Sequence, residues 1–456
     1  MLRSPMTRRL IPLICSFALA CGFVMARSAP PESTQAQLKF VVILTRHGVR
    51  SPTGKASRYD AYSAAPWPAW NVPPGDLTAH GFALMKLFGA YDRASLAAEG
   101  LLAPDGCADA TRVSIVADSD ERTRETGRAL SEGMFPGCDV AVQAGAEDDP
   151  DPLFHPVHAG LGAPDPSLAL AAVAGSIGGD AGNLTEAYYP QLEALDHLLA
   201  GCGRAPVTNA ARRSILDVPV AQGAGDHASE LRGPLSVASS MAETLLLEYA
   251  EGMKGEELSW GCLDEGKLRE IMQLHAAEAE ITDRTPAIAR MNGSNLLAHI
   301  LDALEQNARG KAVPGAPGKP GDRVLFLVGH DTNIASVAGL LDLHWIIDGR
   351  RDDTPPGGAL TFELWRSPDG TSAVRLYYTA QTLLEMREAT PLSLANPPQR
   401  VPVFVPGCGR PDMSCSLDSF ATTVRRVVDP AYVRTGSTDR SAASLGDKAA
   451  LNTEAH

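Results

Sequence analysis

Three short, uninterrupted apolar runs are the feature that most constrains the fold of this 456-residue chain. They are KFVVIL at 39–44, VSIVA at 113–117 and RVLFLV at 323–328. A run without alternating polar residues is typical of a strand that is buried on both faces of a sheet. Because a helical pattern at 76–91 lies between the first two, we predict an α/β fold whose core sheet carries helices on both faces.

A different pattern occupies the middle of the chain. Apolar residues at helical spacing dominate four segments, which are 186–199, 237–249, 267–281 and 295–307. We therefore predict a mostly α-helical insertion domain at 151–310, set into a discontinuous α/β core domain formed by 37–150 and 311–430. A Gly- and Pro-rich linker at 310–322 leads back to the core, and late strands are expected at 361–365 and 374–378. The polar, Ser- and Ala-rich residues 431–456 are expected to form a disordered tail.

Residues 1–26 resemble a secretory signal peptide. An arginine-rich start, an apolar run over 10–24 and a small-residue cleavage site at Val24-Met25-Ala26 give this pattern. The apolar run is short for a membrane span, and no later stretch qualifies as one. We expect a periplasmic or secreted protein with no membrane attachment after cleavage, and lipidation of Cys21 is a weaker alternative.

Six cysteines remain after such a cleavage, and an even number in an exported chain indicates disulfides. They are Cys107, Cys138, Cys202, Cys262, Cys408 and Cys415. Their spacing favours the bonds Cys107–Cys138 and Cys408–Cys415, which leaves Cys202–Cys262 by elimination. No CxxC pair is present among them, so we predict no structural zinc.

The chain is acidic, with 54 Asp and Glu against 40 Lys and Arg and a formal net charge of −14. This balance argues against nucleic-acid binding, which needs a basic surface. An anionic substrate would have to be bound in a local basic pocket, against the overall field of the protein.

Charged residues follow each of the three apolar runs. The runs lead into TRHGVRSPT at 45–53, DSDERT at 118–123 and GHDTN at 329–333. Ligands of open α/β sheets bind beyond the carboxyl ends of the strands. We therefore expect one crevice to gather the side chains of Arg46, His47, Arg50, Arg122, His330 and Asp331.

This set of side chains suits phosphoryl transfer. Guanidinium groups bind phosphate oxygens bidentately, and they stabilise the charge that develops on the phosphoryl group. The same cations disfavour an imidazolium, so His47 would stay unprotonated and could attack phosphorus to form a phosphohistidine. Asp331 is the nearest carboxyl group that could protonate the leaving alkoxide.

Each segment also has an ordinary structural interpretation. Asp331 could cap a helix, residues 118–124 could be a solvated charge cluster, and an RHG triplet alone carries little information. Their joint occurrence after three buried-strand patterns favours a site. The segment His155-Pro156-Val157-His158 could suggest a metal site, but its proline disfavours a helix and a loop is the favoured interpretation.

The motifs RHGVRSPT at 46–53 and GHDTN at 329–333 resemble those of the histidine acid phosphatases (histidine phosphatase superfamily, branch 2). Within that family, the similarity is greatest to the bacterial periplasmic phytase/acid phosphatase group. Further similar segments extend the resemblance over about residues 38–429, and these are ADSDERTRETG, DPLFHP, SWG, RTPAIAR, TPPGGALTFELWR and TPLSLANPP.

The resemblance implies a phosphoglycerate-mutase-like α/β domain plus an α-helical domain, with the active site between them. It implies that His47 is the phosphate-accepting nucleophile and Asp331 the proton donor. The substrate contacts that it implies are Arg46, Arg50, Thr53, Arg122, Glu243 and His330. The bonds Cys107–Cys138 and Cys408–Cys415 also fit the family, and no metal or other cofactor is implied. We expect a monomer that acts on a small phosphomonoester such as phytate or a sugar phosphate.

Two departures from the family pattern bear on the substrate. Gly54 stands where phytases carry a lysine, and Ser240 stands where they carry a methionine. Gly48 and Thr332, in contrast, agree with the phytases rather than with the sister group of glucose-1-phosphatases. We expect an acid phosphomonoesterase, with phytase as the first interpretation. The alternatives are a glucose-1-phosphatase, a broad-specificity acid phosphatase or phosphotransferase, and a non-catalytic phosphate-binding protein.

Overall fold

The computed structural model describes residues 35–434 except 148, 204–208, 210 and 223–230. The predicted signal peptide and residues 435–456 of the predicted tail lie outside the described residues. Within them, a mixed eight-stranded sheet runs in the order β11-β10-β9-β1-β6-β2-β3, with β12 paired to β10. Two short antiparallel pairs, β4–β5 and β7–β8, lie apart from this sheet.

The strands divide the sheet into two halves. The parallel half consists of β1 (Gln37–Arg46), β6 (Val324–Gly329), β2 (Val113–Ala117) and β3 (Val142–Gln143). The antiparallel half consists of β9 (Ala359–Arg366), β10 (Ser372–Ala380), β11 (Gln399–Val403) and β12 (Ser414–Ser416). The three apolar runs form β1, β2 and β6 as predicted, and the two late strands lie within β9 and β10.

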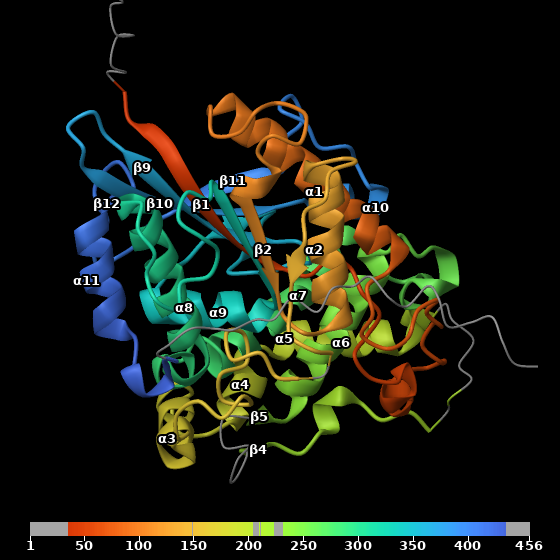
Figure 1. Cartoon of the computed structure of the whole chain (residues 1–456). Coiled ribbons are helices and arrows are strands. Elements are labelled where there is room, and N and C mark those ends of the chain that lie inside the picture. Colours follow the sequence, from red (N-terminus) through yellow and green to blue (C-terminus); the bar gives the residue numbers. More distant parts are fainter. Residues whose placement is uncertain (1–34, 148, 204–208, 210, 223–230, 435–456) are drawn as a thin grey trace, which may run out of the picture. The chain divides into compact units, whose positions relative to one another are not determined.

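Strand β1 packs side chains on both faces of the sheet. Phe40, Val42 and Leu44 belong to a core shared with α8 (Pro286–Arg309), α9 (Asp331–Leu341) and α11 (Leu417–Val427). Val41 and Ile43 point the other way, into a core shared with α1 (Ala79–Ala98) and α2 (Glu121–Met134). Figure 1 shows α1 and α2 on one side of the strands and α8, α9 and α11 on the other. The predicted α/β core with helices on both faces is confirmed.

A third core belongs mainly to the middle of the chain. Its helices are α3 (Pro166–Ser176), α4 (Gly182–Ala187), α5 (Tyr189–Leu199), α6 (Pro234–Ala250), α7 (Glu265–Thr282) and the later α10 (Leu383–Glu388). The helix predicted at 186–199 is two helices, because Pro190 lacks the N–H that a continuous helix needs. Helix α8 packs on the sheet, so residues 151–310 contribute to two cores and their division from the α/β core stays a prediction.

Helix α1 differs from the prediction at both ends. The Thr78 side chain caps it by accepting from the Gly81 amide, so the helix starts at Ala79 rather than at residue 76. It then continues seven residues past the predicted end at Tyr91, and Leu96 is buried in that extension. The apolar spacing in the last two turns is too sparse for the helical pattern to show in the sequence.

Two of the three expected disulfides are confirmed, Cys107–Cys138 and Cys408–Cys415. The expected bond Cys202–Cys262 is wrong for this structure. The Cys202 thiol faces the His197 carbonyl at 3.7 Å, and the Cys262 thiol faces the Trp260 carbonyl at 4.0 Å. Both cysteines lie in the same apolar region. A disulfide also requires the two side chains to point toward each other, which the cysteine count alone does not indicate.

The packed part of the chain extends past residue 430. Tyr432 is buried, and its hydroxyl donates to the Ala163 carbonyl at 2.9 Å. Residues 431–434 are therefore part of the fold rather than of the predicted tail. Among the described residues, no helix is long and apolar enough to cross a membrane.

Two glycines let α1 and α2 approach backbone to backbone. A Cβ added at Gly133 would lie 2.0 Å from the Lys86 carbonyl oxygen, and one added at Gly89 would lie 2.2 Å from that of Leu130. We predict that Gly133→Ala lowers the free energy of unfolding by about 1–3 kcal/mol, because the two helices must move apart. Gly175→Ala in α3 is the matched control. It meets no neighbour, and the better helix propensity of alanine should stabilise it slightly. Urea unfolding of both variants checks the difference in sign.

The carboxyl group of Glu248 is fully buried in α6, and among the described residues one hydrogen bond reaches it, from the Ser259 amide at 3.3 Å. Burial raises the pKa of this carboxyl to about 8. In the unfolded chain it ionises near pH 4, so the folded state holds one more proton between about pH 4 and pH 8. This term stabilises the fold fully at low pH and is lost as the pH rises through that window.

We therefore expect Glu248→Gln to gain free energy of unfolding relative to the wild type as the pH rises from about 4 to 8. The relative gain should be on the order of 2–4 kcal/mol, because glutamine has no proton to lose. Urea unfolding at both pH values measures it, with the exposed Glu256→Gln as the control. A pH-independent difference between Glu248→Gln and the wild type would contradict this account.

Candidate active site

The register of the parallel strands brings the three charged segments to one edge of the sheet. Arg46, the last residue of β1, pairs with Gly329 of β6, and Ala117 of β2 pairs with Val328. The backbone continues these ladders for one more residue, because the His47 amide donates to the Gly329 carbonyl at 2.9 Å and the Asp118 amide to the Val328 carbonyl at 3.0 Å. The side chains after each strand therefore meet, as the sequence predicts.

Arg46 is completely buried. Its Nη1 donates to the Thr354 carbonyl at 2.7 Å, and its Nη2 contacts both Glu243 Oε1 and Asp331 Oδ2, the latter at 3.0 Å. A buried guanidinium is tolerated only with such partners. Arg46 thus ties β1 to α6 and to α9.

His47 is held as an uncharged imidazole. Its Nδ1 lies 2.8 Å from the Gly48 carbonyl, which can only accept, so the ring proton is on Nδ1 and Nε2 keeps its lone pair. Burial lowers the pKa of His47 well below the usual value, and Arg50, Arg46 and Arg122 lower it further. The His47 carbonyl accepts from the Gly357 amide at 3.0 Å, so the residue is fixed on both sides of its backbone. Nε2 is left as a nucleophile even in acid.

Arg50 and Glu243 form the next part of the site. Arg50 Nη2 lies 3.0 Å from Glu243 Oε1, and its Nε lies 3.4 Å from His47 Nε2. Burial opposes ionisation of Glu243, but Arg50 and Arg46 outweigh it and hold the pKa of this carboxyl below its usual value. Glu243 is therefore a carboxylate that occupies the N–H donors of Arg46 and Arg50, which could otherwise bind an anion.

Arg122 and His330 approach from the other two strand ends. Arg122 lies at the start of α2, and its Nη2 is 2.5 Å from Asp120 Oδ2 and 3.5 Å from His330 Nδ1. The ring of His330 lies 5.6 Å from that of His47. Both residues thus border the space next to the His47 imidazole.

Asp331 does not cap α9 as the alternative interpretation allows. His330 is the N-cap residue, and its backbone amide is bonded by the Asn333 side chain. Within the described part of the chain, Asp331 Oδ1 accepts only from the adjacent Thr332 amide at 2.9 Å, while Oδ2 faces Arg46 at 3.0 Å and His275 Nε2 at 3.8 Å. Burial would raise the pKa of Asp331, but Arg46, His275 and Arg50 reverse this and hold it far below its usual value.

Thr53 is exposed at the rim. Its segment is held by Ser51, whose hydroxyl donates to the Pro73 carbonyl at 2.5 Å and accepts from the Gly75 amide at 2.9 Å. A Cβ on Gly75 would stand 3.8 Å from the Thr53 side chain and 3.6 Å from Arg122 Nη1, so these two side chains flank the same glycine. The structure thus brings all eight predicted site residues together.

The site also includes side chains that were not chosen as site residues from the sequence. Asp118 and His155 contact His330, while His275 and its neighbour Ser239, 3.0 Å away, stand behind Asp331. Asp118 directly follows β2, so the rule that locates Arg122 could have found it. His155 belongs to the segment interpreted as a loop, and nothing in the sequence marks His275.

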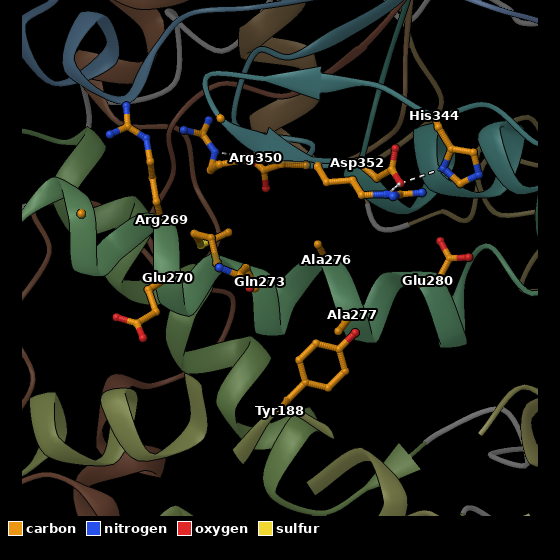
Figure 2. A pocket seen from close by; sticks show the side chains of 15 residues that line it. Tyr188, Arg269, Glu270, Gln273, Ala276, Ala277, Glu280, His344, Arg350 and Asp352 are labelled. Atoms are coloured by element: carbon orange, nitrogen blue, oxygen red, sulfur yellow. Dashed lines mark hydrogen bonds and ion pairs between the residues drawn. The ribbon is translucent and has the colours of Figure 1, made fainter. Parts of the chain in front are cut away.

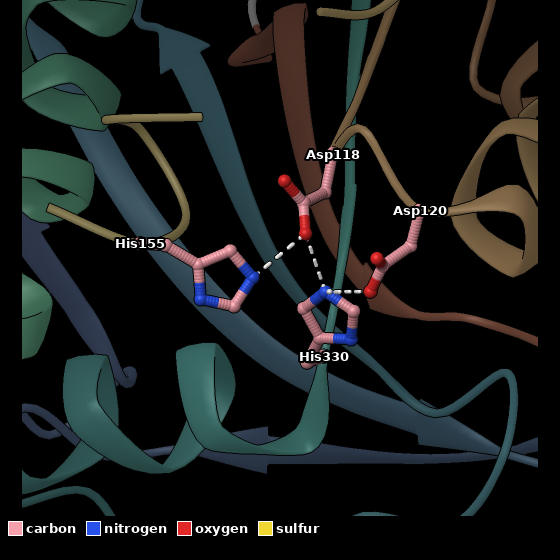
Figure 3. Close-up of side chains that lie close together, drawn as sticks. All are labelled: Asp118, Asp120, His155 and His330. Atoms are coloured by element: carbon pink, nitrogen blue, oxygen red, sulfur yellow. Dashed lines mark hydrogen bonds and ion pairs between the residues drawn. The ribbon is translucent and has the colours of Figure 1, made fainter. Parts of the chain in front are cut away.

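Four side chains have the atoms to hold a metal ion: Asp118, Asp120, His155 and His330. Figure 3 shows both rings directed at Asp118. Its Oδ2 lies 2.6 Å from His330 Nε2 and 2.8 Å from His155 Nε2. These are hydrogen-bond distances, shorter than the separation of over about 3 Å between ligands that each lie about 2.0 Å from a tetrahedral zinc. The donor set suits a metal, but the spacing fits shared protons.

A second concave feature contains none of the predicted site residues. It is a pocket of about 620 Å³ between α7 and residues 344–353. Figure 2 shows Ala276 and Ala277 on its helical wall and Arg350 and Asp352 opposite. Its charges are mixed, and Arg350 is paired with Asp353 at 2.7 Å, so this pocket does not select an anion.

An uncharged histidine among three arginines, facing a carboxyl group at the strand ends of an α/β sheet, has the groups that nucleophilic attack on a phosphoryl group needs. The comparison with known families agrees, because the pattern of the histidine phosphatase superfamily (branch 2) matches residues 37–215 and 243–379. The chain belongs to this superfamily, and it is a phosphoric monoester hydrolase.

Individual relatives cover most of the chain. Phytase AppA of Escherichia coli (strain K12) is 35% identical over 88% of this chain and 96% of its own length. Glucose-1-phosphatase of Salmonella typhimurium is 28% identical over 91% and 98%. The structure of Hafnia alvei phytase in complex with myo-inositol hexakis sulphate is 35% identical, with a TM-score of 0.80 over 89% of this chain and 100% of that one.

The position of Glu243 generates a prediction about anion affinity. Because its carboxylate occupies Arg46 and Arg50, Glu243→Gln should tighten the binding of inorganic phosphate about tenfold near pH 6, by removing one competing negative charge. Isothermal titration calorimetry measures the affinity. Glu251→Gln is the matched control, since Glu251 lies just after α6 and binds Thr78 instead of arginine. Unchanged or weaker phosphate binding in Glu243→Gln would contradict the competition.

Proposed function

We propose that the protein is an acid phosphatase that hydrolyses phosphomonoesters through a phosphohistidine on His47, with phytate as the first candidate substrate. The observation that carries this proposal is the uncharged Nε2 of His47 among Arg46, Arg50 and Arg122. A site for binding alone would need the cations but not a nucleophile held in their midst.

In the first half-reaction, the arginines and His330 hold the phosphoryl oxygens while His47 Nε2 attacks phosphorus. The N–P bond forms, the ester P–O bond breaks, and the leaving alkoxide takes a proton from Asp331. In the second half-reaction, Asp331 accepts a proton from the water that attacks phosphorus, and the N–P bond breaks to release phosphate and free imidazole.

Asp331 must hold a proton for the first of these steps, although Arg46 keeps it ionised in the free site. A bound phosphate dianion would engage Arg46 and add negative charge beside the carboxyl group, which raises its affinity for a proton. Low pH supplies that proton, and this supports an acidic optimum.

Two further carboxyls on the helical side also support an acidic optimum. Burial raises the pKa of Glu278 to about 8 and that of Asp283 to about 7, and both are influenced by Asp331. They are neutral in acid and become negative as the pH rises through 7–8. Negative charge then accumulates beside the pocket and opposes an anionic substrate.

The identity of the phosphomonoester rests on the relatives. The E. coli phytase and the Hafnia phytase complex support an inositol polyphosphate, and the Salmonella glucose-1-phosphatase supports a sugar phosphate as the second candidate. Gly54 and Ser240 stand where phytases carry a lysine and a methionine, so both candidate substrates need to be tested. We also propose that the protein is an exported monomer, which the two disulfides support as far as export is concerned.

The test combines rapid-quench labelling with a substrate profile. A ³²P-labelled monoester should leave covalent phosphate on the wild type but not on His47→Ala, whose kcat should fall on the order of 10³-fold or more. The exposed His158→Ala is the control and should stay labelled. Activity in His47→Ala would reject the mechanism, and phosphate transfer to an added alcohol in preference to water would indicate a phosphotransferase. Rates on phytate, glucose-1-phosphate and nucleotides then rank the substrates.

A further inference from the structure

His155 extends the site beyond the residues that the proposed mechanism uses. It lies in the loop before α3, and its ring is 5.1 Å from the ring of His330. No bond to His47, Arg46 or Arg50 is seen for it among the described residues. Its connection to the site runs through Asp118, a fully buried carboxylate, as Figure 3 shows.

The hydrogen bonds at Asp118 fix where the ring protons are. Oδ2 accepts from Nε2 of both histidines, at 2.6 Å and 2.8 Å, so both rings must carry a proton on Nε2. For His330 this leaves Nδ1 on the side of Arg122, where phosphate would bind. His330 can donate from Nδ1 to a phosphate oxygen only if it carries a second proton and is an imidazolium.

One carboxylate is thus shared by two imidazoles. Its single negative charge cannot fully stabilise a positive charge on both rings at once. Burial opposes protonation of His155, but Asp118 outweighs this and raises its pKa above the usual value. For His330, burial, Arg122 and the nearby His155 outweigh the favourable Asp118 and lower its pKa. A proton on His155 therefore works against a second proton on His330.

The other charged groups around the pair do not replace this coupling. His155 faces Asp118, Asp120 and Arg122 from the β2–α2 segment, and the neighbouring ring of His158 at 6.0 Å. His330 faces the same β2–α2 groups, together with His47 across the pocket and the adjacent Asp331 carboxylate. Asp118 is the group that bonds both rings directly.

We propose that His155 is a positioning residue: by sharing the Asp118 carboxylate, it sets the upper pH limit at which His330 can donate a proton to the bound phosphate. This inference rests on the proposed role of His330 in phosphate binding. It assigns the alkaline limit of activity in part to a residue that touches neither substrate nor nucleophile.

The test is His155→Gln, because the glutamine amide can reach as far as Nε2 and still donate to Asp118 but cannot become a cation. Without the second cation, His330 should keep its extra proton to higher pH. The alkaline limb of kcat/KM and of inorganic phosphate inhibition should move up by about one pH unit, as expected for removal of a charge about 5 Å away. NMR titration of labelled histidines should show the same upward shift for His330, which is a readout independent of activity.

Two further variants fix the sign. Asp118→Asn removes the shared charge, so the limb should move down, opposite to His155→Gln. His158→Gln is the matched control on the same loop, with an exposed ring and no bond to Asp118, and its profile should match the wild type. If Asp118→Asn fails to fold, His155→Gln and its control still decide the question.

Several outcomes would overturn the proposal. If the wild type forms phosphohistidine but the limb and the His330 titration stay in place in His155→Gln, this inference fails and the proposed function stands. An inactive, unlabelled wild type would instead remove the proposed function itself. If a chelator alone moves the wild-type limb to the position of His155→Gln, a bound cation rather than a shared proton sets the limit.

Discussion

The burial of the Arg46 guanidinium is the interaction on which the rest of the site depends. A cation with no access to water must be surrounded by acceptors, and here they come from three separate parts of the chain. The Thr354 carbonyl precedes β9, Glu243 comes from α6, and Asp331 opens α9. Arg46 therefore fixes the relative positions of strand, helix and carboxyl group before any substrate arrives.

The protein buries its acids in two different ways. Asp118, Asp331 and Glu243 lie against cations or imidazoles and are held ionised at low pH. Glu248 and Glu278 lie where burial dominates and are held neutral at the same pH. Both sets of carboxyl groups are in their favoured protonation states only in acid. At higher pH Glu248 and Glu278 ionise, and a buried charge there destabilises the fold. Fold stability and the proposed chemistry thus favour the same pH range.

The parts of the site that were predictable from the sequence are those fixed by backbone topology. A buried parallel strand places the residue after it at a known edge, so KFVVIL, VSIVA and RVLFLV were enough to gather Arg46, Arg122 and Asp331. The position of Glu243 came from family resemblance, since its place on α6 says nothing about β1. The same rule extends to Asp118, the first residue after β2 and four residues before Arg122, whose carboxylate bonds His330.

The features that could not be predicted from the sequence depend on the direction of side chains and on the course of loops. His155 reaches His330 because residues 151–156 fold back over the end of β2, which no periodic pattern in the sequence indicates. Cys202 and Cys262 share an apolar region, but their thiols face different carbonyls. The helix 79–98 outlasts its apolar pattern because tertiary contacts support its last turns: Leu96 is buried, and Arg93 donates to the Met134 carbonyl at the end of α2 at 3.0 Å. In each case tertiary contacts decide what local sequence leaves open.

The backbone of His47 is held from both neighbouring segments, by Gly329 on one side and Gly357 on the other. Such a residue cannot swing toward a distant ester and back again. In the proposed cycle it is therefore the phosphorus atom that moves, first toward a stationary nitrogen and then away from it. The shape of the alcohol portion, and how freely it can slide along the rim, would then govern how readily different esters are turned over.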